Sequence, residues 1–395
     1  MSLKKLIPSK IPISLYIHLP WCEKKCPYCD FNININKSKG DEERLMIAIF
    51  YDIEDSLRYL NGRKFSSIYF GGGTPSLVSS KIIKKIINKL ITLQIIQRDC
   101  EINFELNPKE VTKDYLAEII DSGVNRVSLG IQSFDQSILN SLERNHDSHD
   151  SFKALDILSE FKSIEASIDL IYGIMNQSLS SFRSDLDTFC LYEINHLSLY
   201  QLTIEPNTIF YKKELRIPED SVIESMESMA NKVLNKNNLH QYEVSSWSRN
   251  KKYSNHNMNY WMYGDYLGVG PGAHSKITTE GSIKRMVKLK KVNSYIENPA
   301  KSLITEIDNA SYDLDLAMNL LRIKDGVSFD ELKRKNKKRW TDSKLSRQKW
   351  SMGLFVWYFG TKGTRDLWKD VDFHTVINGP RYKGLVTDIF VKGKL

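Results

Sequence analysis

Residues 14–30 read Ser-Leu-Tyr-Ile-His-Leu-Pro-Trp-Cys-Glu-Lys-Lys-Cys-Pro-Tyr-Cys-Asp, and this stretch decides how the whole chain is interpreted. Its three cysteines, Cys22, Cys26 and Cys29, follow an apolar run at the spacing C-x3-C-x2-C. Three thiolates on one short loop can bind three corners of a cubane iron–sulfur cluster. No fourth cysteine follows, because position 30 is Asp and position 31 is Phe. The spacing therefore predicts a [4Fe–4S] cluster with one iron open to a small molecule.

A zinc ion is the alternative occupant of this loop, with His18 or Asp30 as its fourth ligand. His18 lies inside a predicted strand, however, and zinc ligands commonly come as two C-x2-C pairs rather than at this spacing. We therefore favour the cluster. The remaining cysteines, Cys100 and Cys190, stand apart and are interpreted as small core residues.

Composition indicates a globular protein that works in a reducing compartment. The 395 residues are 41% hydrophobic and 26% charged, and no stretch approaches the roughly 20 apolar residues needed to span a bilayer. No secretion signal is visible at the N-terminus, and five cysteines are a poor disulfide framework, so we expect a cytoplasmic protein. The net charge of +8 is modest and scattered, which argues against a nucleic-acid partner. The densest basic run, 333–339, is interpreted as solvated surface.

Apolar runs alternate with helical patterns up to about residue 205, which predicts parallel strands joined by helical crossovers. Strands are expected at Ser14–His18, Ser67–Phe70, Glu101–Leu106, Arg126–Gly130, Ala166–Leu170 and His196–Leu202. Helices are expected at Glu42–Leu60, Ser79–Ile91, Thr112–Ser122, Ser151–Phe161 and Ser180–Tyr192. Six such units form either a doubly wound sheet or a partial barrel. The fold class is therefore α/β.

The chemically unusual residues gather where these strands end. The cysteines follow the first strand and Gly71–Gly73 follow the second, while Glu105 ends the third, Gln132 follows the fourth and Asp169 lies near the end of the fifth. Parallel α/β sheets bind their ligands at the carboxyl ends of the strands. We therefore expect one site at this rim, in a domain covering residues 1–240. The less regular remainder, 241–395, is predicted to be a smaller, mainly helical domain.

The cysteine spacing followed by Gly71-Gly72-Gly73-Thr74-Pro75 resembles the radical S-adenosylmethionine (SAM) superfamily. The resemblance implies a partial (β/α)6 barrel of the TIM type. It also implies a [4Fe–4S] cluster whose open iron chelates SAM and whose electron cleaves SAM to a 5′-deoxyadenosyl radical. The missing Cβ atoms of the glycines suit close backbone approach to the methionyl end of SAM. Without the cysteines, a tight strand–helix turn would be the commoner explanation of the glycines.

The resemblance extends to the HemN/HemW group, which includes oxygen-independent coproporphyrinogen III oxidases. It implies SAM contacts from Tyr16, Tyr28, Gly72, Gly73, Thr74, Glu105, Gln132, Arg144 and Asp169. The carboxylates of Glu105 and Asp169 suit the SAM ammonium or ribose hydroxyls, Arg144 its carboxylate, and Tyr28 the adenine face. Capping or ion pairing at a strand end is the alternative role for the two carboxylates.

Two features resemble the HemW family rather than HemN. HemN has an extra cysteine where this chain has Phe31, and residues 256–261 read H-N-x-x-Y-W, similar to the haem-binding signature of HemW. The resemblance implies haem contacts from His256, Tyr260 and Trp261, with His274 and other histidines still open as iron ligands. A histidine beside two packing aromatics is the alternative explanation. The resemblance covers residues 12 to about 285; Met175 and Pro271 depart from it, and the tail beyond about 330 aligns loosely near 371–390.

The resemblance implies a haem chaperone that binds haem, a cluster and SAM and transfers haem to an acceptor protein, for example one of the respiratory chain. It also implies a low-potential electron donor and peripheral contact with membrane proteins. The rival function is oxygen-independent coproporphyrinogen III dehydrogenase, which makes protoporphyrinogen IX by radical SAM chemistry. Phe31 and the H-N-x-x-Y-W segment argue against that enzyme, so we assign no catalytic residue.

Overall fold

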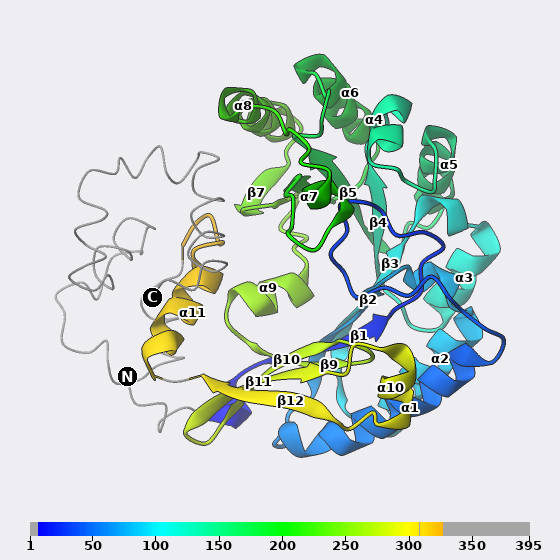
Figure 1. Cartoon of the computed structure of the whole chain (residues 1–395), viewed down its shortest axis with the longest axis vertical. Coiled ribbons are helices and arrows are strands. Elements are labelled where there is room, and N and C mark those ends of the chain that lie inside the picture. Colours follow the sequence, from blue (N-terminus) through cyan, green and yellow to red (C-terminus); the bar gives the residue numbers. More distant parts are fainter. Residues whose placement is uncertain (1–6, 308, 327–395) are drawn as a thin grey trace.

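Six parallel strands form the centre of the sheet in the computed structural model, which describes residues 7–307 and 309–326 (Figure 1). They are β1 (Ile13–Leu19), β2 (Phe65–Gly72), β3 (Ile96–Leu106), β4 (Arg126–Gln132), β5 (Glu165–Tyr172) and β6 (His196–Gln201). The strands pair in chain order from β1 to β6, and every one of these pairs is parallel. This order requires a crossover connection after each strand.

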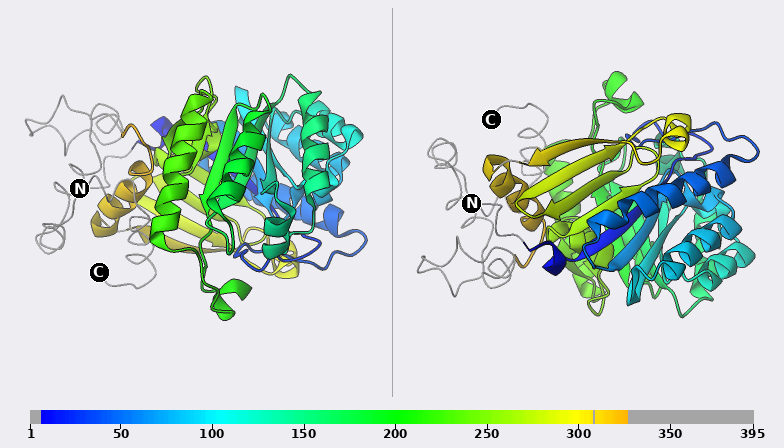
Figure 2. Two further views of the ribbon diagram at one scale, coloured as in Figure 1. Left: turned by 90° about the horizontal axis from the view of Figure 1, so that it is seen from above. Right: turned by 90° about the horizontal axis from the view of Figure 1, so that it is seen from below.

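Helices supply these crossovers and cover the outer, convex face of the sheet (Figure 2). They are α1 (Asp41–Ser56), α2 (Ser80–Thr92), α3 (Lys113–Asp121), α4 (Gln136–Ser141), α5 (Ser148–Ser159) and α6 (Leu179–Cys190). Helix α2 illustrates the pattern, because Ile82, Ile83, Ile86 and Ile87 are buried while its lysines lie on the opposite face. Apolar side chains three and four positions apart form one stripe, which faces the sheet.

Strands from the later part of the chain extend the sheet at both ends, so that the described residues form a sheet of twelve strands. On one side lie β9 (Asp265–Val269), parallel to β1, and then the antiparallel β10 (His274–Thr279), β11 (Ser282–Lys288) and β12 (Ser302–Ile307). Beyond β6 lie the antiparallel β8 (Ser246–Ser248) and β7 (His240–Glu243). The remaining helices are α7 (Ile209–Lys212), α8 (Asp220–Lys236), α9 (Asn255–Trp261), α10 (Val292–Glu297) and α11 (Asn309–Leu320).

Helix α9 lies on the inner, concave side of the curved sheet, where it packs against β1, β2, β3 and β9 (Figure 1). The backbone N–H groups of Asn255 and His256 at its start both donate to the Glu101 carboxylate of β3, at 3.1 and 3.0 Å. A carboxylate at a helix N-terminus satisfies N–H groups that have no partner within the helix. The H-N-x-x-Y-W segment is therefore held inside the barrel.

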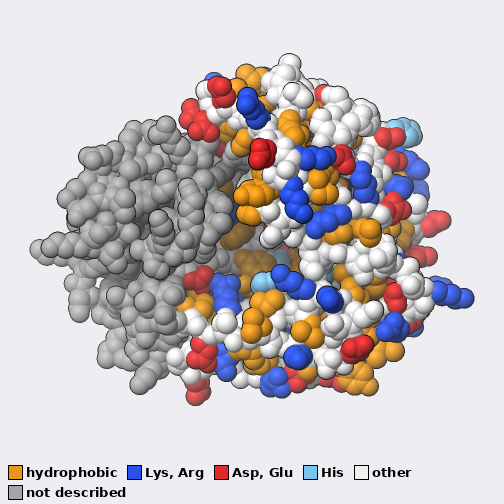
Figure 3. All heavy atoms as spheres, in the orientation of Figure 1, with side chains coloured by type: hydrophobic (Ala, Val, Ile, Leu, Met, Phe, Trp, Pro, Cys, Tyr) orange, Lys and Arg blue, Asp and Glu red, His pale blue; other side chains and the backbone are white. Residues whose placement is uncertain are grey.

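The surface carries basic and acidic side chains mixed together over the face drawn in Figure 3. Among the described residues, no helix combines the length and apolar character that a membrane span requires. The basic run 333–339, the predicted helices of the tail and the loosely matching segment 371–390 lie outside the described residues.

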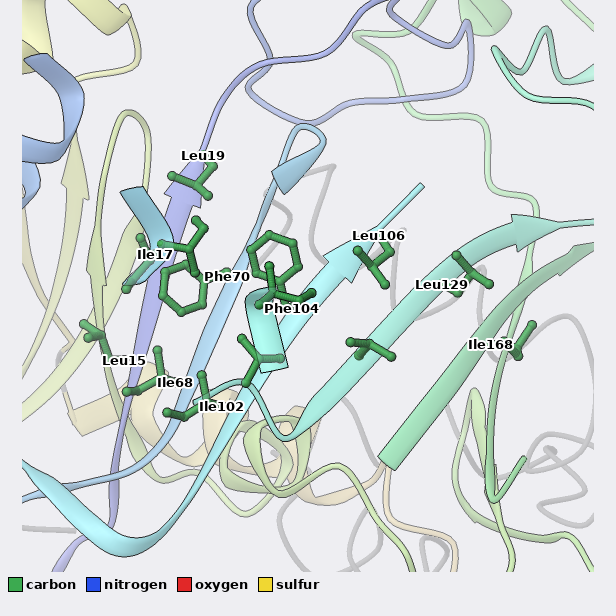
Figure 4. Packing of buried hydrophobic residues seen from close by; sticks show 14 of the residues in the cluster. Leu15, Ile17, Leu19, Ile68, Phe70, Ile102, Phe104, Leu106, Leu129 and Ile168 are labelled. Carbon is green, nitrogen blue, oxygen red and sulfur yellow. The ribbon is translucent and has the colours of Figure 1, made fainter. Parts of the chain in front are cut away.

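Strict alternation along the central strands separates the core from the site. Leu15, Ile17 and Leu19 of β1 are at most 1% exposed and pack outward with Ile68, Phe70, Ile102, Phe104 and Leu106 (Figure 4). The residues between them, such as Tyr16, His18, Tyr69 and Glu105, point to the concave side, because successive side chains of a strand face opposite ways. The polar half of each strand therefore lines the inside of the barrel.

The predicted α/β fold class and the six central strands are confirmed. The expectation of mainly helical structure after residue 240 is wrong for the described residues, where strands β8–β12 lie. The prediction failed because charged residues are buried in these strands. Asp265, Lys276 and Lys288 interrupt the alternation of apolar and polar residues by which a strand is recognised in a sequence. These strands extend the same sheet, and the boundary at residue 240 stays a prediction.

Candidate functional site

The cysteine loop leaves the end of β1 and passes across the rim of the barrel. Two backbone hydrogen bonds tie the loop back on itself, from Asn34 N to Pro20 O at 2.7 Å and from Cys22 N to Asn34 O at 3.1 Å. A tight turn, closed by the bond from Cys29 N to Cys26 O at 3.1 Å, brings the second and third thiols onto one side. The structure thus brings Cys22, Cys26 and Cys29 together at the mouth of one cavity.

This cavity, which we call the cysteine cavity, has a volume of about 420 Å³. Most of the predicted cluster and SAM residues line it: Cys22, Cys26, Cys29, Tyr28, Gly73, Thr74, Glu105, Gln132, Arg144 and Asp169. Its volume lies within the range of about 300–1,000 Å³ that is typical of small-molecule sites. Tyr16 and Gly72 are the two predicted SAM residues that do not line it.

The glycine turn after β2 packs directly against the cysteine loop. Gly73 N donates to Leu19 O at 2.8 Å, and Thr74 N donates to Trp21 O at 2.7 Å. A Cβ atom on Gly73 would lie 2.5 Å from the Trp21 carbonyl oxygen, too close for any side chain. Thr74 Oγ1 lies 3.3 Å from Cys22 Sγ. The glycines therefore permit contact between two loops, in addition to the close approach of a ligand that the sequence suggests.

Arg144 connects the cysteine loop to the barrel wall. Its Nη1 atom donates to Tyr28 Oη at 3.2 Å and lies 3.6 Å from Cys26 Sγ, while Nη2 donates to Asn107 Oδ1 at 2.9 Å and to Gly130 O at 3.2 Å. Its buried Nε has no partner among the described residues. A buried cation with one donor still unused suits the carboxylate of a bound ligand.

The two carboxylates of the cavity are held by hydroxyl donors. Tyr69 Oη donates to Glu105 Oε1 at 2.8 Å, Gly72 N donates to Oε2 at 3.2 Å, and Ser128 Oγ lies 3.0–3.1 Å from both Asp169 oxygens. Burial raises the pKa of Glu105 to about 7 and that of Asp169 to about 6. A bound cation would favour the ionised form of both, because opposite charge lowers a carboxyl pKa.

The cysteines themselves fit a metal cluster. Burial raises the pKa of the Cys22 thiol to about 11 and raises the pKa of Cys29 as well, so neither thiolate is stabilised by the protein alone. Coordination to iron deprotonates a thiol outright. Among the described residues, no three His, Cys, Asp or Glu side chains are grouped tightly enough for a single ion. A cubane instead takes its thiolates at separate corners.

A second cavity of about 520 Å³ lies on the other side of Glu105 and Tyr69, which line both cavities. We call it the histidine cavity, because His18, His256 and His274 line it together with Tyr16, Tyr260, Tyr266, Asn257 and Lys290. Its walls come from β1, α9, β9 and the start of β10, so they combine segments that are more than 200 residues apart in sequence. Five of its 16 lining residues are Tyr or Phe, and three more are His.

Of the three residues of the H-N-x-x-Y-W segment that are expected to contact haem, two line the histidine cavity and one lies outside it. His256 is 1% exposed, with Nδ1 2.9 Å from Ser67 Oγ and Nε2 3.0 Å from Tyr260 Oη, and burial lowers its pKa to about 3. Tyr260 lines the histidine cavity beside it. Trp261 lines neither cavity and instead has the Arg322 guanidinium 4.1 Å from its ring centroid.

Tyr69, Asn107 and Lys290 are among the cavity residues that sequence reasoning missed. Tyr69 could have been found, because it alternates with the outward Ile68 and Phe70 and must therefore face the same side as Glu105. Asn107 and Lys290 follow strand ends, but their partners Arg144 and Asn32 are distant in sequence and left no local signal.

Comparisons with known proteins agree with this geometry. The model of the "Radical SAM superfamily" matches residues 16–189, which contain the cysteine loop, the glycine turn and strands β1–β5. The solved structure of coproporphyrinogen III oxidase (HemN) from Escherichia coli, a radical SAM enzyme, aligns with a TM-score of 0.71 at 20% identity. That alignment covers 84% of this chain and 80% of HemN and shows the shared fold. The chain is thus a radical SAM protein.

The relatives narrow the family further. "Heme chaperone HemW" of Buchnera aphidicola subsp. Acyrthosiphon pisum is 39% identical over 313 residues, covering 79% of this chain and 83% of the relative. "Heme chaperone HemW" of Escherichia coli K12 is 33% identical over the same coverage of both chains. The chain belongs to the HemW family. A radical SAM domain implies a [4Fe–4S] cluster and SAM, for which the cysteine cavity supplies fitting residues.

Proposed function

We propose that the protein is a haem chaperone, which binds haem beside a [4Fe–4S] cluster and SAM and hands it to an acceptor protein. The observation that carries this proposal is likeness to HemW chaperones over four fifths of the chain, together with an H-N-x-x-Y-W segment inside the barrel. The histidine cavity next to the cysteine cavity supports the proposal, because tyrosine side chains in its lining suit contact with a porphyrin.

In the cysteine cavity, Cys22, Cys26 and Cys29 would hold the cluster. When bound, the cluster supplies an open iron that chelates SAM and an electron for its reduction. Arg144 would receive the SAM carboxylate on its unpaired Nε, and Glu105 and Asp169 would hold the ammonium or ribose hydroxyls. The remaining proposed contacts come from Tyr28, Gly73, Thr74 and Gln132 in the cavity wall and from Tyr16 and Gly72 behind it.

For haem, Tyr260 and His256 would form part of the wall of the histidine cavity. Trp261, which packs against Arg322, would stabilise α9. An acceptor protein, for example of the respiratory chain, and a low-potential electron donor complete the scheme. We place this work in the cytoplasm, with peripheral contact to membrane proteins where the acceptor lies in a membrane.

Anaerobic reconstitution tests the cluster first. We expect about four irons per chain in the wild type, and loss of iron in Cys22→Ser. The matched control is Cys100→Ser, because Cys100 is buried outside both cavities, on the outer face of the sheet. Equal iron loss in the two variants, or a zinc-only protein from oxygen-free preparations, contradicts the cluster assignment.

Haem transfer tests the chaperone role. Reconstituted protein loaded with haem should pass it to an apo-acceptor such as an apo-cytochrome in solution, and the acceptor's own absorption spectrum reports the transfer. The rival function predicts instead that coproporphyrinogen III is converted to protoporphyrinogen IX with SAM and a reductant. Conversion without haem retention would replace the chaperone proposal by the enzyme.

A further inference from the structure

Three histidines line the histidine cavity, and they differ in what their ring nitrogens bind. His18 has Nδ1 3.0 Å from Tyr16 Oη and Nε2 2.8 Å from Asn32 O, and His256 is bonded at both nitrogens as described above. His274, by contrast, is exposed, and among the described residues no group hydrogen-bonds to its imidazole. An iron ligand needs a nitrogen lone pair that no other donor occupies. Only His274 offers one without breaking a bond inside the protein.

The backbone under His274 is held firmly although its side chain is exposed. Gly268 of β9 approaches so closely that a Cβ there would lie 2.2 Å from His274 O, and Gly268 N donates to Ser275 Oγ at 2.8 Å. The turn before His274 is fixed from the cysteine loop, because Asn32 Nδ2 donates to Pro271 O and to Lys290 O, both at 2.9 Å. A ligand side chain on a fixed backbone needs little ordering when it binds.

The surroundings of His274 suit a flat apolar ligand with anionic groups. Tyr260 and Tyr266 pack edge to face in the wall with ring centroids 4.5 Å apart, and Lys290 stands beside His274 at the lining. Figure 3 shows a hollow in this face with a histidine and basic side chains around it. Aromatic faces pack against a porphyrin, and a lysine attracts its propionates. The cavity volume of about 520 Å³ lies within the range of about 300–1,000 Å³ that is typical of small-molecule sites.

We propose that His274, rather than His256, supplies the axial imidazole to haem iron. The inference rests on the proposed haem-binding function and names the ligand within it. His256 then acts as a positioning residue, because its bonds to Ser67 and Tyr260 fix the wall of the cavity. Although the side chain is exposed, its partial burial and the nearby charges of Lys290 and Arg285 lower the pKa of His274, which favours the neutral imidazole. Tyr260 is a poorer candidate, because its hydroxyl already lies 3.0 Å from His256 Nε2 in a hydrogen bond.

Haem titration of four proteins tests the inference: wild type, His274→Ala, His256→Ala and the control His149→Ala, which removes an exposed histidine of α5. We expect His274→Ala to bind haem about tenfold more weakly or worse and to lose the absorption and resonance Raman signature of an imidazole ligand. Exogenous imidazole should restore that signature in His274→Gly. His256→Ala should keep the signature in whatever haem it binds, and His149→Ala should match the wild type.

The outcomes separate the two claims. Wild-type protein that binds no haem refutes the proposed function, and the ligand assignment with it. Wild-type protein that binds haem, with an unchanged spectrum in His274→Ala, refutes the ligand assignment alone. Loss of the imidazole signature in His256→Ala and its retention in His274→Ala would return the role to His256.

Discussion

Gly73→Ala is predicted to damage the cluster site through the backbone alone. Gly73 has no unusual backbone conformation, so alanine is allowed there, but its Cβ would lie 2.5 Å from Trp21 O and 2.7 Å from two Pro20 atoms. Ordinary contacts begin near 3.4 Å, so the cysteine loop must move by about 0.9 Å. Such overpacking costs about 1–3 kcal/mol. Because about 1.4 kcal/mol corresponds to a tenfold change in an equilibrium constant, the population of the cysteine loop in its packed position should fall by a factor of roughly 5–150 relative to displaced positions.

The assay is iron retention after anaerobic reconstitution, followed over time in the presence of a chelator. Gly40→Ala is the matched control, because it sits at the far end of the same loop with φ of +88° and open space around its Cβ. Left-handed strain costs alanine about 1–2 kcal/mol there, a similar penalty that moves no cysteine. Faster iron loss in Gly73→Ala than in Gly40→Ala is expected. Equal retention in both would refute the reasoning that contact between the two loops positions the thiols.

Three further predictions concern the buried ion pair of Asp265, the ionisation of Glu105 and the hydroxyl of Tyr69. Asp265→Asn leaves two buried cations unpaired and should lower the free energy of unfolding by about 3–5 kcal/mol, whereas Asp187→Asn in an exposed pair should cost at most about 0.5 kcal/mol in the same urea titration. SAM affinity measured by calorimetry should rise as the pH rises through about 7, because the buried Glu105 carboxyl, with a pKa of about 7, must ionise to accept hydrogen bonds from the amino group or ribose hydroxyls of SAM. Glu105→Gln should flatten that dependence. Tyr69→Phe removes the hydroxyl shared by the two cavities and should weaken any effect of SAM on haem affinity, measured as the ratio of haem dissociation constants with and without SAM.

The central strands could be predicted because the signal for each strand lies in the order of its own neighbouring residues. Apolar and polar residues alternate in β1 and β2, so both the outward core and the inward polar face can be read from the order of residues. The edge strands were missed because Asp265 and Lys276 are buried in them, each satisfied by the other across the β9–β10 pair. From the sequence alone, a charged residue that is paired inside the core cannot be distinguished from a charged residue on the surface.

The site shows the same division. The cysteines, the glycine turn and Glu105 lie at strand ends, and the topology of a parallel sheet is enough to bring them to one cavity. The surroundings of His256 could not be predicted, because its partner Ser67 lies 189 residues away and the helix enters the barrel only when Glu101 binds its N-terminus. His256, the expected haem ligand, is buried and bonded at both ring nitrogens, whereas the unbonded imidazole of the histidine cavity belongs to His274, which begins the unpredicted strand β10.

The shared wall explains how SAM could matter to a haem carrier even when it is not cleaved. Tyr69 donates its hydroxyl to Glu105 and stands with its ring centroid 4.9 Å from that of His256, which in turn binds Tyr260 in the haem-side wall. If SAM binds Glu105 as proposed, it would compete with Tyr69 for this acceptor, and the buried phenol, whose pKa burial raises strongly, would then need another partner. A displacement of Tyr69 would be transmitted to the histidine cavity through its contact with His256 and the hydrogen bond between His256 and Tyr260. Because linkage is reciprocal, haem bound there must alter SAM affinity by the same factor.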